Sequence, residues 1–321
     1  MPTLHDVPEV ARLLAGVLTA EPVTHGALAV IPLLAPDLDD PDWLTLEEAG
    51  DRVRVTEVSE AGSVPFLKVV NDADQPLLLL DGEELVGAKQ NRILNTTVLV
   101  AAHAELTIPV SCVEQGRWGY RGRQFRPGDA SLFASLRARK AARVSQSLRV
   151  GLGHLADQGE VWAQLSVRAS ELDVDSPTGA MRDLYFRHES DLAAARRALA
   201  VQPGQVGALV FVANRWVGLD LLAGPGLFGR AWPRLCAGYV ADAIGRKPEP
   251  WLRLDAGVIF AELTGTQAER APAVGLGEEY RLGSAGLAGA TLVAERRVAH
   301  LMAFPGVADA RNEMDSPHVD Q

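Results

Sequence analysis

The pattern of hydrophobic and polar positions predicts strands over most of the N-terminal part of the chain. After a short amphipathic helix at 6–18, residues 26–116 consist of short runs rich in branched residues, separated by Pro, Gly, Asp and Asn. Consecutive runs of this kind are typical of an antiparallel sandwich or barrel. We expect the sandwich-like arrangement, with a tight hairpin turn at Asp81-Gly82.

Helical spacing then replaces the strand pattern. Pro127-Gly128-Asp129 is expected to end the sheet and to cap the first helix of this region. Apolar residues recur at helical spacing in two further segments, 160–172 and 178–200. The central part of the chain is therefore predicted to be helical.

The C-terminal part mixes both patterns, with an expected hairpin at Asn214-Arg215, a helix at 227–244 and three closing strands. The fold class is therefore α+β, with an antiparallel β-sandwich-like N-terminal part, central helices and a mixed antiparallel α/β C-terminal part. We divide the chain into four parts that could still form one integrated domain: 1–125 (β-rich), 126–204 (helical), 205–305 (mixed) and 306–321 (a flexible tail).

Composition and charge narrow the class of function. The chain has 321 residues and a formal net charge of −10. An acidic surface repels nucleic acid and anionic lipid, so RNA is a disfavoured partner and no membrane association is expected. No apolar run reaches the roughly 18 residues of a membrane helix, and the N-terminus does not resemble a signal peptide. We therefore expect a cytoplasmic protein.

The two cysteines and seven histidines do not have the spacing of a metal site, so we expect no metal and no cofactor. Cys112 falls on the apolar face of its strand and is interpreted as a core residue rather than a nucleophile. The segment 224–229 matches a dinucleotide-binding loop in its glycines alone. Pro225 removes a backbone N–H there, and no βαβ unit surrounds the segment.

The densest polar run is Lys89-Gln90-Asn91-Arg92, between two apolar strands. Its many donors and two positive charges suit the recognition of phosphate or carboxylate, and Arg92 could bind such a group through two hydrogen bonds. An exposed polar turn that closes a hairpin explains the same residues equally well. The sequence leaves both interpretations open.

A second cluster follows the strand at 106–113. Strand alternation places Glu114 at the end of the core face, where a carboxylate needs a cationic partner such as Arg117 or Arg92. Trp118 offers a flat face on which a base could stack. Glu114 is also the candidate acid or base if the protein is an enzyme.

Residues 117–149 carry nine basic side chains and a single acidic one, Asp129. The favoured interpretation is a basic helix face paired with acids elsewhere in the fold or in another subunit. The alternative is a surface that faces a nucleotide, a phosphorylated ligand or RNA.

Four strings of the sequence together resemble one bacterial family, the ADP-ribosylglycohydrolase-and-rhodanese-phosphatase-associated protein domain family. They are GEELVGAKQNRILN, IPVSCVEQGRW, GLDLLAGPGLFGRAWPRLCAGYVADA and VAHLMAF, and the resemblance covers most of residues 26–305. It implies a context of ADP-ribose, NAD or nucleotide metabolism in stress or defence. It identifies no catalytic residue.

Three functions are consistent with these features. The first is a ligand-binding or sensor protein. Its ligand would be an anionic, phosphorylated small molecule related to a nucleotide or to ADP-ribose. The second is an enzyme that acts on such a ligand with Glu114 as acid or base. The third is a structural or interaction module, such as a homo-oligomer, in which Arg92 and Glu114 form a buried ion pair. The expected ligand-binding residues are Lys89, Gln90, Asn91, Arg92, Glu114, Arg117 and Trp118.

Overall fold

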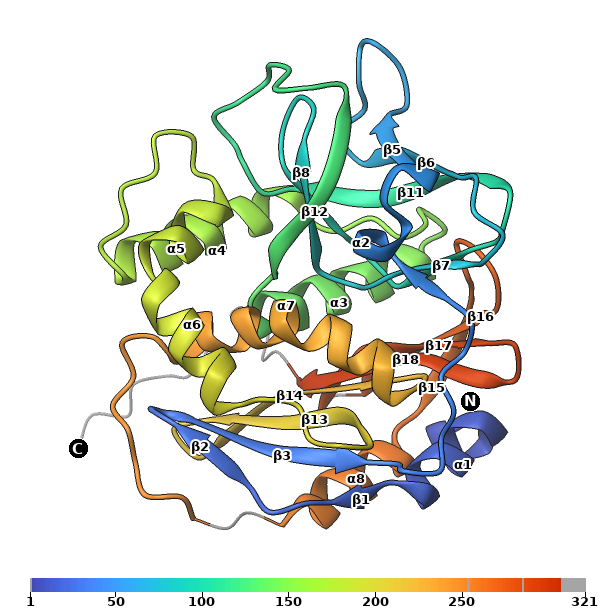
Figure 1. Cartoon of the computed structure of the whole chain (residues 1–321), viewed down its shortest axis with the longest axis vertical. Coiled ribbons are helices and arrows are strands. Elements are labelled where there is room, and N and C mark those ends of the chain that lie inside the picture. Colours follow the sequence, from blue (N-terminus) through green and yellow to red (C-terminus); the bar gives the residue numbers. More distant parts are fainter. Residues whose placement is uncertain (1, 253–254, 285, 307–321) are drawn as a thin grey trace, which may run out of the picture.

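The computed structural model describes residues 2–252, 255–284 and 286–306 of the chain. Figure 1 shows a barrel above a large sheet, with helices between them and at one side. The α+β class predicted from the sequence is confirmed. From residue 307 on, the tail predicted at 306–321 lies outside the described residues.

Six strands of the N-terminal part close into a barrel in the order β11–β6–β5–β12–β8–β9. The predicted sandwich-like arrangement is not confirmed, because β11 and β12 each pair with two other strands and so close the sheet into a barrel. β12 pairs with β5 at its start and with β8 further on, while β11 pairs with both β6 and β9. The strands are β5 (Val53–Glu57), β6 (Phe66–Asn71), β8 (Glu83–Gly87), β9 (Arg92–Leu94), β11 (Ala104–Cys112) and β12 (Gln124–Ser131).

The large sheet has nine strands in the order β1–β3–β13–β14–β18–β17–β16–β15, with β2 also paired to β3. Its strands are β1 (Leu18–Thr19), β2 (Val23–His25), β3 (Leu28–Leu34), β13 (Gln205–Val212), β14 (Arg215–Leu222), β15 (Ala268–Pro272), β16 (Glu278–Ser284), β17 (Leu287–Ala294) and β18 (Arg297–Pro305). The N-terminal strand β3 lies beside the C-terminal β13, with Val30 opposite Val210. Segments 1–125 and 205–305 therefore share this sheet.

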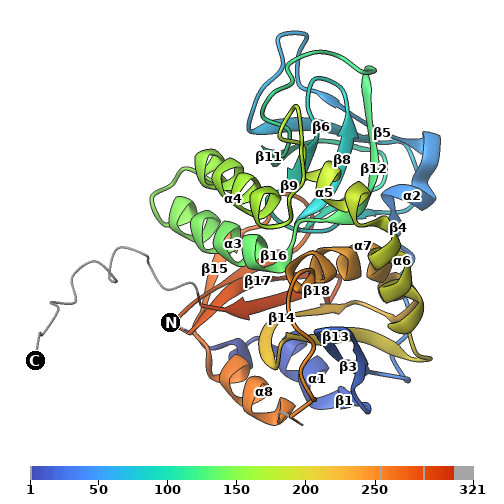
Figure 2. The same cartoon turned by 90° about the vertical axis from the view of Figure 1, so that its left-hand side faces the viewer.

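Helices cover both faces of the large sheet (Figures 1 and 2). α3 (Ala134–Arg149) and α7 (Pro225–Ala243) fill the space between the sheet and the barrel, whereas α1 (Pro8–Gly16) and α8 (Ala256–Gly265) lie on the opposite face. Gly238 lets α7 approach closely, because a Cβ at this position would lie 2.8 Å from the carbonyl oxygen of Leu132. A hydrophobic cluster lies on each side of the sheet.

Three helices stand beside the barrel: α4 (Gln158–Glu171), α5 (Met181–Arg187) and α6 (Glu189–Ala198). The single helix predicted at 178–200 is divided at His188, whose backbone (φ −113°, ψ 26°) leaves the helical region. The prediction that residues 127–129 end the sheet is wrong, because they belong to β12. Ala134 begins the next helix instead.

The tight hairpin predicted at Asp81-Gly82 is also not formed. β7 (Leu77–Leu79) pairs with β10 (Val98–Val100) and β4 (Leu44–Thr45) rather than with β8, and the short helix α2 (Leu46–Ala49) follows β4. Asp81 is fully buried and pairs with Arg137 and Lys140 of α3. These contacts hold the segment before β8 against the helix layer.

A buried polar network links α3 and α7 to the large sheet. Asp220 accepts two hydrogen bonds from Arg137, at 2.9 and 2.7 Å. The hydroxyl of Tyr239 donates to the same carboxylate at 2.6 Å, and the Nε2 atom of His300 lies 2.9 Å from it. Burial would raise the pKa of Asp220, but the charge of Arg137 and the bond with His300 outweigh it and lower the pKa.

Candidate functional site

The run Lys89–Arg92 connects β8 to β9 and is nearly inaccessible to solvent. The exposed fractions of these four residues are 8, 4, 2 and 0 % in chain order. The interpretation as an exposed turn is therefore wrong. The run closes a β8–β9 hairpin, but the segment 114–121 covers it.

Lys89 holds a loop in place and contacts the ring of Trp118, whose exposed fraction is 51 %. The Nζ atom of Lys89 donates to the carbonyl oxygens of Glu60 and Ala61, at 2.7 and 2.6 Å. The same atom lies 5.2 Å from the ring centroids of both Trp118 and Tyr120. A cation in this position stabilises the covering segment through cation–π contacts.

Arg92 lies in the interior of the barrel, next to Cys112 and Glu57. Its Nη1 atom donates to the backbone oxygen of Gln90 at 3.2 Å, and Glu57 Oε1 is 3.9 Å from Nη2. Burial lowers the pKa of the Arg92 guanidinium and raises the pKa of the Cys112 thiol to about 11. A thiol with this pKa fits the interpretation of Cys112 as a core residue.

Glu114 is buried, as predicted, and its partner is Arg117 rather than Arg92. Arg117 Nη2 donates to Glu114 Oε2 at 2.6 Å, and the backbone N–H of Asn91 donates to the same oxygen at 3.2 Å. Thr178 donates to Oε1 at 3.2 Å. Burial would raise the pKa of Glu114, but the bonds from Arg117 and Asn91 outweigh it and lower the pKa.

Asn91 connects this cluster to a cleft that sequence reasoning did not find. Its side-chain nitrogen lies 3.5 Å from Oε1 of Glu84, and Arg117 donates to its side-chain oxygen at 3.1 Å. Glu84 belongs to the wall of a cleft of about 480 Å³ between β8, β12, α5 and α6. The lining residues are Glu84, Asp129, Ala130, Arg182, Tyr185, Phe186, Glu189, Leu192 and Arg196.

Glu84 is a carboxyl group without an ion-pair partner in the part of the chain that the structure describes. Its exposed fraction is 2 %, and Gly128 of β12 packs so tightly against it that a Cβ there would lie 2.6 Å from Oε2. Burial raises the pKa of Glu84 to about 8. The sequence does carry a signal for this residue. Glu84 precedes the barrel-core residue Leu85 in the same strand, so strand alternation places its side chain outside the barrel.

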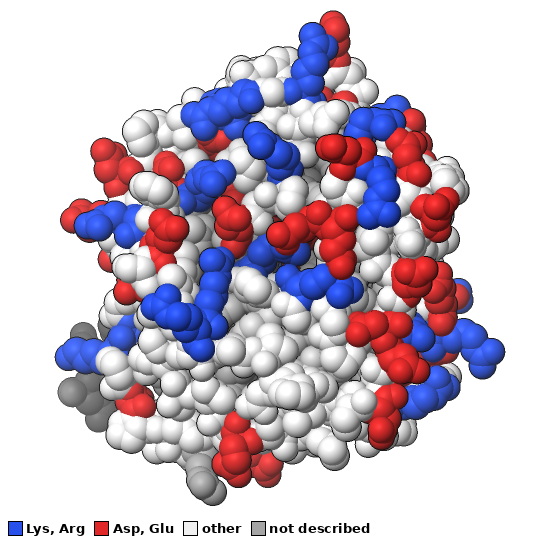
Figure 3. All heavy atoms as spheres, in the orientation of Figure 1, with Lys and Arg blue, Asp and Glu red and all other residues white. Residues whose placement is uncertain are grey.

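Two arginines and an exposed ring complete the cleft. The Arg182 side chain is 46 % exposed and lies 3.8 Å from Asp129. Arg196 is fixed by bonds to the backbone oxygens of Pro233 and Asp129, at 3.0 and 2.7 Å. Phe186 is 77 % exposed. Figure 3 shows basic and acidic side chains interleaved over the barrel and the adjoining helices of this face.

Most of the basic segment 117–149 is paired with acids, as the favoured interpretation predicted. Arg137 and Lys140 lie in the core beside Asp81. The remaining pairs on α3 join Arg139 and Arg143 to Glu160, and Arg149 to Glu269. An anion-binding surface along this helix is therefore not supported.

The segment 224–229 also has its own partner. The carboxylate of Asp40 accepts from the backbone N–H groups of Gly226 and Leu227, at 2.8 and 2.9 Å. An acidic side chain therefore already occupies the N-terminus of α7, where a dinucleotide phosphate would bind. This contact agrees with the sequence evidence against a dinucleotide-binding loop at 224–229.

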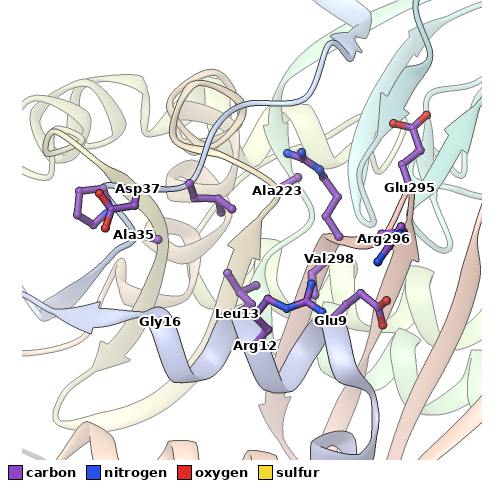
Figure 4. A pocket seen from close by; sticks show the side chains of 13 residues that line it. Glu9, Arg12, Leu13, Gly16, Ala35, Asp37, Ala223, Glu295, Arg296 and Val298 are labelled. Carbon is purple, nitrogen blue, oxygen red and sulfur yellow. The ribbon is translucent and has the colours of Figure 1, made fainter.

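A second cleft of about 500 Å³ lies between α1, the segment after β3 and the β17–β18 turn. Figure 4 shows Glu9 and Arg12 projecting from α1 toward this turn, which carries Glu295 and Arg296. No charged side chain that lines this cleft is buried. It therefore lacks a buried ionisable group such as Glu84.

Within the described residues, no group of three or more His, Cys, Asp or Glu side chains could hold a metal ion. No helix in the same part of the chain has the length and apolar character needed to cross a membrane.

A family model described as the ARG and Rhodanese-Phosphatase-superfamily-associated Protein domain matches residues 16–304. The chain belongs to this family. No curated protein and no solved structure matches the chain. The description of this family names associated proteins and states no activity.

Two of the four strings that resemble the associated-protein domain family meet behind the cleft. GEELVGAKQNRILN contains Glu84 and Asn91, and IPVSCVEQGRW contains Glu114 and Arg117. None of the seven predicted binding residues lines the cleft: Lys89, Gln90, Asn91, Arg92, Glu114, Arg117 and Trp118. Residues of these two strings therefore bond to one another and to Glu84 behind the cleft wall rather than lining the cleft.

Arg92→Ala is expected to lower the melting temperature without changing ligand binding in the cleft. The substitution removes hydrogen bonds to Gln90 and the contact with the half-exposed ring of Trp118, but no atom of the cleft wall. Differential scanning fluorimetry with and without AMP measures both effects. A folded Arg92→Ala variant that no longer binds AMP would show that the binding site is the run Lys89–Arg92 and not the cleft.

Proposed function

We propose that the protein is a ligand-binding or sensor protein for a small anionic, nucleotide- or ADP-ribose-related molecule, which it binds in the Glu84 cleft. The observation that carries this proposal is the pair of arginines, Arg182 and Arg196, at a cleft whose wall includes a desolvated carboxyl group. Guanidinium groups bind phosphate through charge-assisted hydrogen bonds. The volume of about 480 Å³ lies within the usual range for small-molecule sites.

The exposed ring of Phe186 supports the nucleotide-like part of the proposal. It offers an apolar face at the same cleft, on which a base could stack at little cost because few neighbours cover it. A phosphate beside Arg182 and a base against Phe186, one turn further along α5, would use neighbouring parts of the cleft wall. Such an arrangement leaves Asn91, Glu114 and Arg117 to position Glu84 rather than to touch the ligand.

An enzyme with Glu114 as acid or base is the alternative proposal, and the contacts give it less support. Both carboxylate oxygens of Glu114 already accept hydrogen bonds, and the residue does not line the cleft. A role in a stress, defence or NAD-related pathway, a cytoplasmic location and a homo-oligomer stay predictions.

The test is a thermal-shift screen of the whole chain with AMP, ADP-ribose, NAD, inorganic phosphate and short RNA. A ligand at about 100 times its dissociation constant adds about 2.7 kcal/mol to the free energy of unfolding, which shifts the melting temperature measurably. We expect AMP and ADP-ribose to stabilise the protein and RNA not to. A melting temperature that none of these ligands changes would favour the structural alternative.

A further inference from the structure

The carboxyl group of Glu84 conflicts with the binding of an anion in the same cleft. It is buried in the cleft wall, and no lysine, arginine or histidine of the described residues lies within 4 Å of it. An ionised carboxylate in a desolvated wall would repel a phosphate with little screening by water. The cleft can hold an anion well only if this group is neutral.

The surroundings of Glu84 favour the neutral form. Asp129 of β12 and Glu114, which follows β11, add negative potential, whereas Arg182 of α5 opposes them. α6 brings one acid and one base to the cleft, Glu189 and Arg196. Burial is the largest effect and raises the pKa of Glu84 to about 8. At neutral pH the group therefore carries a proton.

The two oxygens of Glu84 differ in their hydrogen-bond partners. Oε1 lies 3.5 Å from the side-chain nitrogen of Asn91, whereas Oε2 makes no hydrogen bond within the described residues. The nearby hydroxyl of Tyr185 does not compete, because it donates to the backbone oxygen of Ser131 at 2.6 Å. A protonated carboxyl group in this position can donate a hydrogen bond to an anion, whereas the ionised group would repel it.

We propose that Glu84 enters the complex as a carboxylic acid and donates its proton in a hydrogen bond to the terminal phosphate of the ligand, so that the cleft selects phosphate monoesters. This inference rests on the proposed function and adds the protonation state at binding. It also narrows the ligand class to molecules with a terminal phosphate, so that AMP should bind more tightly than ADP-ribose or NAD, whose phosphates are all diesters. The bond from a neutral acid to a phosphate dianion is charge-assisted and short. Arg182 and Arg196 supply positive charge to the cleft. Glu84 supplies a hydrogen-bond donor that is lost when the carboxyl group ionises.

Calorimetric titration with AMP between about pH 7 and about pH 9.5 tests the proposal. The phosphate of AMP stays dianionic throughout this range, since the second pKa of a phosphate monoester is about 6. The association constant of the wild type is expected to stay constant below about pH 8 and then to fall about tenfold per pH unit. Near pH 9.5 the loss is about thirtyfold, and binding is accompanied by the uptake of nearly one proton.

Glu84→Gln is the decisive variant, because its amide keeps a donor at every pH. It is expected to bind AMP with no such fall and with no proton uptake. Asp242→Asn is the matched control, since Asp242 is another carboxyl whose pKa burial raises, bonded to Ser135 and outside this cleft. This control should keep the pH-dependence of the wild type.

The outcomes separate this inference from the proposed function. AMP binding by the wild type that does not weaken between about pH 8 and about pH 9.5, or that weakens equally in Glu84→Gln, overturns the role of the Glu84 proton and leaves the binding site standing. Failure of the wild type to bind AMP near pH 7 overturns the proposed function, and the inference with it.

Discussion

Asp220→Asn is expected to lower the free energy of unfolding by about 3–5 kcal/mol, because it leaves the guanidinium of Arg137 buried without its closest counter-charge. Asp220 and Arg137 are 0 % and 1 % exposed, and two hydrogen bonds join them. The same substitution weakens the bonds to Tyr239 and His300, which come from α7 and β18. Chemical denaturation of the variant and the wild type measures the difference.

An ion pair on the surface provides the control for this substitution. Asp72 pairs with Arg54, but the two side chains are about half exposed, so Asp72→Asn is expected to cost about 1 kcal/mol or less. If the two substitutions cost the same, the buried network does not hold the sheet to the helix layer. Arg137→Met combined with Asp220→Leu should recover much of the loss, because no charge is then left unpaired.

Arg182→Ala is expected to weaken AMP binding by about one to two factors of ten, since a charge-assisted hydrogen bond contributes about 1.5–3 kcal/mol. Arg182 makes one long ion pair, with Asp129 at 3.8 Å, and its side chain is half exposed. Its removal should therefore leave the melting temperature of the free protein almost unchanged. Calorimetric titration of the wild type and the variant gives the ratio of dissociation constants.

Arg187→Ala is the matched control for Arg182→Ala. Arg187 lies on the same helix and is exposed, but it does not line the cleft. The Arg187→Ala variant should bind AMP as the wild type does, because it removes the same charge from α5 as Arg182→Ala but no contact in the cleft. Equal losses in both variants would mean that net charge, rather than the cleft, governs binding.

The sequence predicted elements with strong local patterns and failed where distant strands decide the arrangement. The helix at 227–244 is formed, and so is the predicted hairpin, although its turn residues are Ala213 and Asn214 and Arg215 already belongs to β14. Turn residues and helical spacing are local signals. Closure of the barrel depends on the pairing of β11 with both β6 and β9, and strand patterns do not encode that partnership.

The candidate site shows the same limit. Strand alternation and the cost of a buried charge predicted a cationic partner for Glu114, either Arg117 or Arg92, and Arg117 takes that place at 2.6 Å. The cleft itself joins Glu84, Asp129, Arg182 and Arg196, which are spread over more than a third of the chain. Lys89 and Arg92 looked exposed because polar runs usually are, whereas here the segment that follows β11 covers them.

A crystal structure of the whole protein soaked with AMP tests the central claim most directly, because it locates the ligand. The predicted result is a phosphate beside Arg182 and Glu84, with the base against Phe186. AMP bound at Lys89, Arg92 and Trp118 or in the cleft of Arg12 and Arg296, or a Glu84 cleft left empty at a saturating concentration, would contradict the account.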